Sequence, residues 1–187
     1  MMELIPALKL GWLNGWILLV VEFSIQGFLL LVFPKDVVAR LFDRSDWSVK
    51  QRSFLVAGKV FSLACLALII FTPLKTTSNI LLVGLILYAT GLTGLVIAML
   101  NFKDTPPGQP VTKGIYKISR HPQNVAIIIF ILGICVAIGS WAALFMLVMS
   151  KLLQHFSILA EEEVCLKRYG ESYRAFMERV PRYFLFF

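Results

Sequence analysis

The chain has 187 residues, of which 58% are hydrophobic, and its mean hydropathy is +0.80. This composition is too apolar for a soluble domain built around one core, and the length leaves no room for several domains. We therefore predict a single membrane-embedded domain over residues 1–187. The formal net charge of +7 does not indicate a nucleic-acid partner, because the basic residues are spread over separate loops and form no single patch.

The chain contains five long apolar runs. A helix rises about 1.5 Å per residue, so about 20 apolar residues cross the hydrocarbon of a bilayer, which is about 30 Å thick. We predict an all-α polytopic membrane protein with five transmembrane helices and a cytoplasmic C-terminal helical segment. Only Gly139 and Ser140 separate the last two runs, which predicts a tight helical hairpin. The runs are residues 10–33, 53–72, 80–100, 124–138 and 141–160.

Basic residues outside these runs predict the orientation. The N-terminal tail, the second loop and the hairpin tip carry at most one Lys or Arg each, whereas the first loop, the third loop and the C-terminal tail carry four or five. The positive-inside rule then places the N-terminus outside and the C-terminus in the cytoplasm.

Two segments have patterns that concern packing and surface contact. In the third run, Thr90, Gly94 and Ala98 have the small-xxx-small spacing that lets two helices approach closely. The first loop, residues 34–52, mixes apolar and charged side chains. It is either an amphipathic piece at the membrane interface or a plain solvated loop.

The fifth run becomes polar on one side toward its end. Lys151, Gln154, His155, Ile158 and Glu162 have the spacing of one helical stripe. Such a stripe is costly in lipid unless it faces protein or a wet cavity, so we predict that it lines a cleft open to the cytoplasmic segments. The alternative is that Lys151 and His155 only satisfy neighbouring polar groups.

Two ionisable residues inside the runs lie at the same predicted depth. Glu22 in the first run and Lys151 in the fifth are each about 15 Å from the cytoplasmic ends of their helices at 1.5 Å per residue. An isolated charge at this depth is costly. We therefore predict that these two helices are neighbours and that Glu22 and Lys151 interact, directly or through Gln26 or Gln154.

The third loop and the C-terminal segment hold most of the remaining chemistry. Arg120-His121-Pro122, taken alone, is typical of a helix entrance, and Glu161-Glu162-Glu163 of a solvated charge run. The three cysteines have no paired spacing, so we expect neither a disulfide framework nor a metal site.

Taken together, the two segments resemble the membrane methyltransferase superfamily that includes isoprenylcysteine carboxyl methyltransferase and phospholipid N-methyltransferases. The similarity covers roughly residues 80–183. Its first part is Gly-x-Tyr-x-x-x-Arg-His-Pro at 114–122, and its second is Glu161-Glu162, Tyr169-Gly170, Tyr173, Phe176 and Val180-Pro181.

The chain departs from this pattern at three positions. Asn124 and Ala126 stand where the superfamily usually has Tyr and Gly, and Cys165 stands where Leu is usual. The pattern therefore loses one aromatic contact to a cofactor, although the amide of Asn124 still offers hydrogen bonds.

The resemblance implies that S-adenosylmethionine binds without a Rossmann domain, in a region of about residues 101–187. Arg174 would anchor a carboxylate or phosphate, and Glu162 or His155 would act as the base for an amine or thiol acceptor. The implied catalytic residues are thus Glu162, Arg174 and His155. The implied cofactor-binding residues are Lys113, Gly114, Tyr116, Arg120, His121, Pro122, Asn124, Glu161 and Glu162.

The leading prediction is an S-adenosylmethionine-dependent methyltransferase whose acceptor is lipophilic or membrane-embedded, of the isoprenylcysteine carboxylate or phospholipid type. Membrane lipids are the expected surroundings, and the sequence leaves the oligomeric state open. Two alternatives remain: an NADPH-dependent reductase, since sterol reductases resemble the same C-terminal region, and a non-enzymatic membrane protein that keeps the fold.

Overall fold

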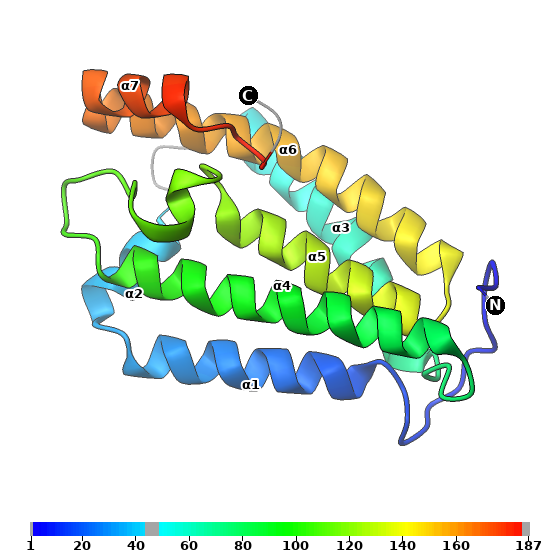
Figure 1. Ribbon diagram of the computed structural model, residues 1–187. Helices are drawn as coiled ribbons and strands as arrows, with labels where there is room; N and C mark the ends of the chain where they lie inside the picture. Colours follow the sequence, from blue (N-terminus) through cyan, green and yellow to red (C-terminus); the bar gives the residue numbers. More distant parts are fainter. Residues whose placement is uncertain (1, 44–48, 185–187) are drawn as a thin grey trace.

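The computed structural model describes residues 2–43 and 49–184, and in these residues the chain is helical, with two isolated β-bridges and no strand (Figure 1). The elements are α1 (Trp16–Val32), α2 (Lys35–Leu41), α3 (Val49–Phe71), α4 (Asn79–Lys103), the 3-10 helix η1 (Gly114–Lys117), α5 (Pro122–Ala137), α6 (Trp141–Tyr169) and α7 (Glu171–Arg179).

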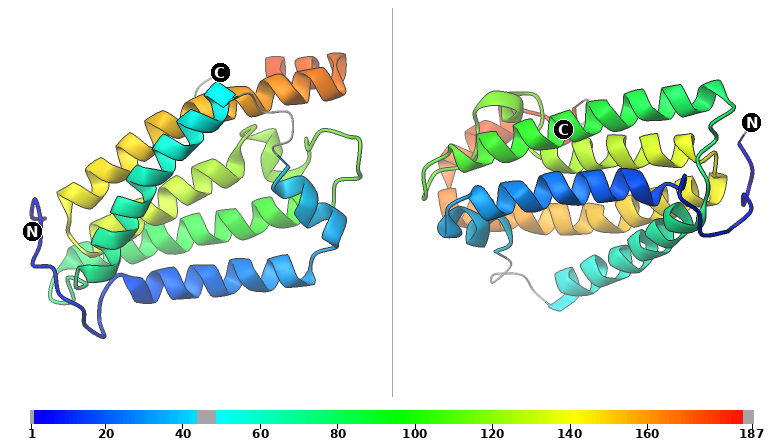
Figure 2. Two further views of the ribbon diagram at one scale, coloured as in Figure 1. Left: turned by 180° about the vertical axis from the view of Figure 1, so that it is seen from behind. Right: turned by 90° about the horizontal axis from the view of Figure 1, so that it is seen from below.

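The bundle is built from two closely packed helix pairs. α4 packs along α5, and α3 packs along α6, while α1 lies beside these pairs and makes its closest helix contacts with α3 (Figures 1 and 2). After a turn at Gly170, α7 folds back against the end of α6, at the end of the bundle that also carries η1 and α2 (Figure 1). This end is therefore where the polar segments of the sequence meet.

Three of the helices that the structure describes are long and apolar enough to cross a membrane: Arg52–Phe71, Asn79–Lys103 and Trp141–Tyr169. α1 and α5 are apolar too, but shorter. Large side chains such as Leu31 and Leu63 are 87% and 65% exposed, as expected for helices surrounded by lipid. The all-α membrane architecture is thus as predicted, whereas the crossing of all five runs and the orientation stay predictions.

The first apolar run contains a shorter helix than its composition predicts. The helix begins at Trp16, and residues before it form an irregular segment. The side-chain amide of Asn14 donates hydrogen bonds to the carbonyl oxygens of Lys9 and Ile70, at 2.7 and 3.0 Å. These bonds fix the irregular segment to the end of α3, and a hydropathy pattern does not report them.

The closest approach of α4 and α5 does not involve Thr90, although Ala98 of the predicted trio is fully buried. Thr90 is exposed and its hydroxyl donates to the carbonyl oxygen of Ile86 at 2.8 Å, so it does not lie between the helices. A Cβ at Gly91 would lie 2.3 Å from the backbone nitrogen of Phe130. Gly84 and Gly133 are similarly tight, and Gly94 only touches the side chain of Ala126.

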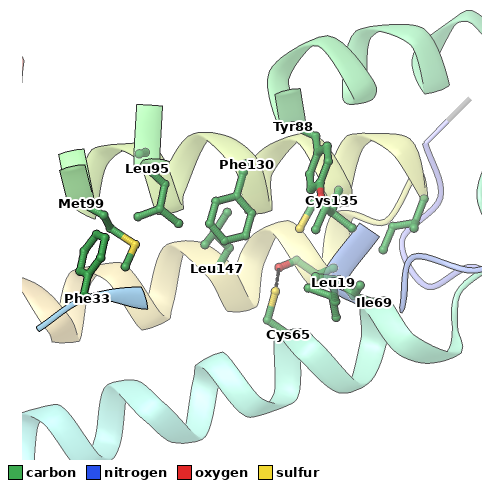
Figure 3. Packing of buried hydrophobic residues seen from close by; sticks show 14 of the residues in the cluster. Leu19, Phe33, Cys65, Ile69, Tyr88, Leu95, Met99, Phe130, Cys135 and Leu147 are labelled. Atoms are coloured by element: carbon green, nitrogen blue, oxygen red, sulfur yellow. Dashed lines mark hydrogen bonds between the residues drawn. The ribbon is translucent and has the colours of Figure 1, made fainter. Parts of the chain in front are cut away.

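The hydrophobic core lies where the two pairs meet (Figure 3). Leu95, Phe130, Leu147 and Ile69 come from four different helices and are each at most 4% exposed. Cys65 and Cys135 are buried in the same core as free thiols, and Cys165 is half-buried. The expectation of unpaired cysteines is confirmed.

The first loop forms a short helix in its described part. α2 has Val37 buried, while Lys35 and Asp36 are exposed, so residues 35–41 form an amphipathic helix, which was one of the two alternatives. The rest of the predicted interfacial piece includes residues 44–48, which lie outside the described residues.

Candidate functional site

The third loop is shaped so that Arg120 and His121 lie immediately before α5. The side-chain oxygen of Asn101, at the end of α4, accepts a hydrogen bond from the backbone N–H of Ile115 at 2.9 Å. Gly114 has a φ of +59°, and a Cβ there would lie 1.8 Å from that same oxygen, so only glycine fits. Pro122 is the first residue of α5, a position that needs no N–H.

Glu162 is the centre of a buried ionic cluster, and only 3% of the residue is exposed. Its Oε1 accepts a hydrogen bond from Arg120 Nε at 2.8 Å and lies 3.2 Å from His121 Nε2. Its Oε2 accepts two hydrogen bonds from Arg182, at 3.0 and 2.8 Å. Both oxygens are thus occupied by cationic or imidazole partners, which makes the burial of the carboxylate possible.

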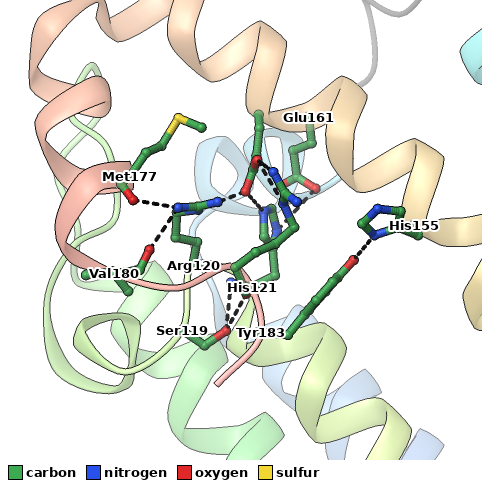
Figure 4. A network of polar contacts seen from close by, with 10 residues as sticks. Ser119, Arg120, His121, His155, Glu161, Met177, Val180 and Tyr183 are labelled. Carbon is green, nitrogen blue, oxygen red and sulfur yellow. Dashed lines mark hydrogen bonds and ion pairs between the residues drawn. The ribbon is translucent and has the colours of Figure 1, made fainter. Parts of the chain in front are cut away.

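Arg120 also holds the segment that follows α7 against the start of α5 (Figure 4). Its NH1 donates to the carbonyl oxygens of Met177 and Val180, at 2.8 Å each, and its backbone N–H donates to the carbonyl oxygen of Pro181 at 2.9 Å. Ser119 Oγ donates to the carbonyl oxygen of Arg182 at 2.8 Å. The two sequence segments are therefore bound together by Arg120 and Ser119.

The hydrogen bond to Glu162 raises the pKa of Arg182, so this guanidinium remains protonated throughout the neutral range. Arg182 thereby supplies a permanent positive charge beside Glu162. The sequence analysis did not place this residue in the site, although its position directly after Val180-Pro181 was a usable signal.

A cavity of about 280 Å³ lies beside the cluster, enclosed by α2, the end of α4, the third loop, α5, α6 and α7. This volume is close to the lower end of the range for ligand pockets, about 300–1,000 Å³. Six residues that the resemblance implied line it: Tyr116, Arg120, His121, Pro122, Asn124 and Glu161.

Several polar groups of the wall are available to a ligand. Asn124 lines the cavity, and its side chain makes no hydrogen bond to any residue that the structure describes. The buried hydroxyl of Ser157 also lacks a partner within the described ranges 2–43 and 49–184. Glu161 is half-exposed, and its Oε2 lies 3.9 Å from His121 Nδ1. Such groups supply donors, acceptors and a negative charge.

Aromatic residues form another part of the wall. Tyr116 and Tyr173 are buried, and burial raises the pKa of both phenols, which therefore stay neutral. Gln123 donates to the hydroxyl of Tyr116 at 3.1 Å, which fixes that ring. Phe102 and Phe176 line the same cavity. A flat aromatic ligand could stack here.

Charged residues from distant parts of the chain close one side of the cavity. Arg168 on α6 pairs with Asp43, which follows α2, at 3.0 Å. Arg40 donates to the carbonyl oxygens of Phe102, Thr105 and Pro106 at 2.9–3.1 Å, and its guanidinium lies 4.6 Å from the centre of the Phe102 ring. No spacing in the sequence indicates these contacts, because their partners are 62 or more residues apart.

Five residues that the resemblance implied do not line the cavity. Lys113 is exposed, Gly114 shapes the turn, and His155 is held by a 2.8 Å contact between its Nδ1 and the hydroxyl of Tyr183 (Figure 4). Arg174 is 64% exposed and lies 3.4 Å from Glu171. Glu162 stands directly behind the wall.

Part of the polar stripe on α6 lines the cavity as predicted, whereas Lys151 and His155 contact the neighbouring polar groups of Gln154 and Tyr183, as in the alternative. Gln154 and Ile158 line the cavity, and Glu162 lies in the cluster behind it. His155 and Lys151 are half-buried. The described residues contain no group of three or more His, Cys, Asp or Glu that could hold a metal ion.

The model of the phospholipid methyltransferase family matches residues 67–172, which is more than half of the chain. The match includes α4, η1, α5 and α6 entirely, and with them Arg120, His121 and Glu162. It ends before α7 is complete and before Arg182. Neither a curated protein nor a solved structure matches the chain.

Proposed function

Because this chain belongs to the phospholipid methyltransferase family, we propose that it is an integral membrane enzyme that transfers the methyl group of S-adenosylmethionine to a lipophilic acceptor. The observation that carries this proposal is the cavity between the two sequence segments. Arg120, His121, Asn124 and Glu161 all line it, and Glu162 links the segments from behind.

The residues of the cavity fit the proposed cofactor. S-adenosylmethionine combines a flat purine, ribose hydroxyls and a charged amino-acid end. Tyr116, Phe102 and Tyr173 offer aromatic surface for the purine, and the unpaired amide of Asn124 offers hydrogen bonds. The carboxylate of Glu161 suits a cationic group.

When bound, S-adenosylmethionine supplies a methyl group on a positively charged sulfur, and an acceptor takes it by displacement. The chain then has to align donor and acceptor and exclude water. We assign binding to the residues of the cavity wall. Glu162 is a positioning residue, because both of its oxygens are already used to hold Arg120, His121 and Arg182.

His121 is the residue we favour for proton transfer when the acceptor is an amine or thiol. It lines the cavity, and Glu162 orients its ring through Nε2. His155 has no such access, because its Nδ1 contacts Tyr183 and it does not line the cavity. An acceptor carboxylate would need no base, since it is already ionised.

We further propose that the site faces the cytoplasm, where the basic loops are expected. The acceptor would enter sideways from the bilayer, since the site lies at the end of helices whose outer surfaces are apolar. The proposal includes no nucleic-acid partner.

Isothermal titration calorimetry of the protein in lipid nanodiscs tests the proposal. We expect S-adenosylmethionine to bind to the wild type and NADPH not to bind. Asn124→Ala should weaken binding about tenfold, corresponding to the loss of about 1.4 kcal/mol of hydrogen bonding. Arg174→Ala, at an exposed position outside the cavity, is the control and should bind as the wild type does. A folded wild type that binds no S-adenosylmethionine would refute the function.

A further inference from the structure

A second cavity, of about 200 Å³, lies inside the bundle between α1, α3, α5 and α6. Most of its wall is apolar, with Phe23, Leu66 and Leu147 among the lining residues. Two ionisable side chains also line it, Glu22 from α1 and Lys151 from α6. It shares no lining residue with the first cavity, which lies beside the Glu162 cluster and which we propose for S-adenosylmethionine. That first cavity is called the cofactor cavity from here on.

The two ionisable groups are placed differently within this cavity. Lys151 Nζ donates to Gln154 Oε1 at 3.0 Å, and Gln154 donates in turn to Ser150 at 2.9 Å. Glu22 is 4% exposed, and its carboxyl group makes no hydrogen bond or ion pair within the part of the chain that the structure describes. The sequence predicts that Glu22 and Lys151 interact, directly or through Gln26 or Gln154. Both residues line this cavity, but Lys151 contacts Gln154, and the described residues show no contact between Lys151 and Glu22.

A buried carboxyl group without a partner is costly in an apolar environment. A ligand that donates a hydrogen bond to the Glu22 carboxyl group would therefore be favoured in this cavity. Glu22 and Lys151 carry opposite formal charges, so a cationic or an anionic ligand would add a net charge to this cavity. A hydroxyl group adds none, and it can donate a hydrogen bond to Glu22 or accept one from Lys151.

We propose that this cavity binds the polar end of a neutral, lipophilic molecule that carries a hydroxyl group, such as a long-chain alcohol or a phenol. Its apolar part contacts Phe23, Leu66 and Leu147. Phe23 is 55% exposed and also belongs to the outer surface of α1, so the cavity is reached from the bilayer.

Gln154 connects this site to the cofactor cavity. It lines the cofactor cavity and also bonds Lys151, Ser62 and Ser150, which line the second one. Binding of the alcohol is nevertheless independent of methyl transfer, so failure of this inference leaves the proposed function standing.

Photolabelling in nanodiscs tests the inference. The probe is a twelve-carbon alcohol with a diazirine in its chain, and labelled peptides are identified by mass spectrometry. We expect saturable labelling of peptides from α1, α3 or α6 that line the cavity. Unlabelled dodecanol should compete at least tenfold more effectively than dodecylamine, dodecanoic acid or dodecane, since the amine and the acid add a charge and the alkane offers no hydrogen bond.

Two lysine variants test whether the alcohol binds in this cavity. Lys151→Met should weaken competition by dodecanol at least tenfold, whereas Lys59→Met removes a lysine at an exposed position on α3 outside the cavity and should change nothing. Equal competition by the four compounds on the wild type would overturn the inference, even if the variants fail to fold. The inference is also overturned if dodecanol competes equally well against labelling of Lys151→Met and of Lys59→Met.

Discussion

Glu161 and Glu162 are adjacent in the sequence but occupy opposite environments. The side chain of Glu161 is 52% exposed and lines the cofactor cavity, whereas that of Glu162 is 4% exposed and makes hydrogen bonds to two arginines. One helical step of about 100° separates them, which suffices to move a carboxylate from a cavity into a buried cluster. Two adjacent glutamates can therefore have different roles, one in ligand binding and the other in stabilising the fold.

The two glutamates should respond differently to the same substitution. Glu162→Gln leaves Arg120 and Arg182 without their buried counter-charge, and breaking such a pair costs about 3–5 kcal/mol. We expect a marked fall in unfolding temperature together with weaker S-adenosylmethionine binding. Glu161→Gln should weaken binding but leave the unfolding temperature close to that of the wild type. Thermal unfolding and calorimetry in one detergent measure both, and equal thermal losses in the two variants would contradict this assignment.

The two arginines near the end of the chain give a second comparison. Arg182→Met removes both hydrogen bonds to Glu162 Oε2, so we expect lower stability and lost methyl transfer. Arg174→Met should change stability by less than about 0.5 kcal/mol, because it is mostly exposed and has only a surface partner. Chemical unfolding and a methyl-incorporation assay on lipid extracts measure the two effects. Wild-type stability and activity in Arg182→Met would show that the cluster is dispensable.

At the scale of whole helices, the bundle depends on how closely α4 and α5 approach. Both helices line the cofactor cavity, with Phe102 on α4 and Pro122 and Asn124 on α5. A change in their separation therefore alters the cavity without touching any residue that lines it.

Gly91→Ala should widen this separation. The added Cβ would lie 2.3 Å from the nitrogen of Phe130 and 2.8 Å from the carbonyl oxygen of Ala126, both of which are backbone atoms. Overpacking of this kind costs about 1–3 kcal/mol. Gly27→Ala on α1 meets nothing within 4 Å and should be neutral or slightly stabilising. Unfolding temperatures of the two variants provide the test, and equal effects would show that the α4–α5 contact can relax freely.

Hydropathy predicts the three long helices well because each contains a long, strongly apolar stretch. It does not predict where α1 begins, since Asn14 fixes the preceding residues by long-range hydrogen bonds. It also does not predict which face of α4 meets α5. Thr90 and Gly91 are neighbours on one helix, and only the partner helix decides which of them is buried.

At the scale of the whole molecule, the orientation in the membrane can be measured directly. The loop before α4 and the η1 loop after it lie at opposite ends of a 25-residue helix. In a variant without its own cysteines, Lys117→Cys should react with a membrane-impermeant maleimide only from the cytoplasmic side, and Thr77→Cys only from the opposite side. The basic third loop is the reason for this expectation. The reverse labelling pattern would invert the proposed orientation.

The candidate site was only partly predictable from the sequence, because some of its contacts join residues that are far apart along the chain. Arg120, His121 and Glu162 belong to motifs whose residues stand close together in the sequence, and the structure brings them within hydrogen-bonding distance. Arg40, Asp43 and Arg168 belong to no such motif. The contact between Asp43 and Arg168 joins residues 125 positions apart, and this contact depends on how the bundle closes.

The hydrogen bonds near the N-terminus can form only after the residues of the α5–α6 hairpin have been synthesised. The backbone of Glu3 bonds to Gly139 and Trp141, and Leu4 bonds to Ala142. Translation proceeds at about 5–20 residues per second, so residue 3 is synthesised roughly 10–30 s before these partners. Arg182 emerges later still, after Glu162. A nascent chain can therefore insert its long helices while its cofactor cavity is incomplete, so that membrane integration precedes catalytic competence.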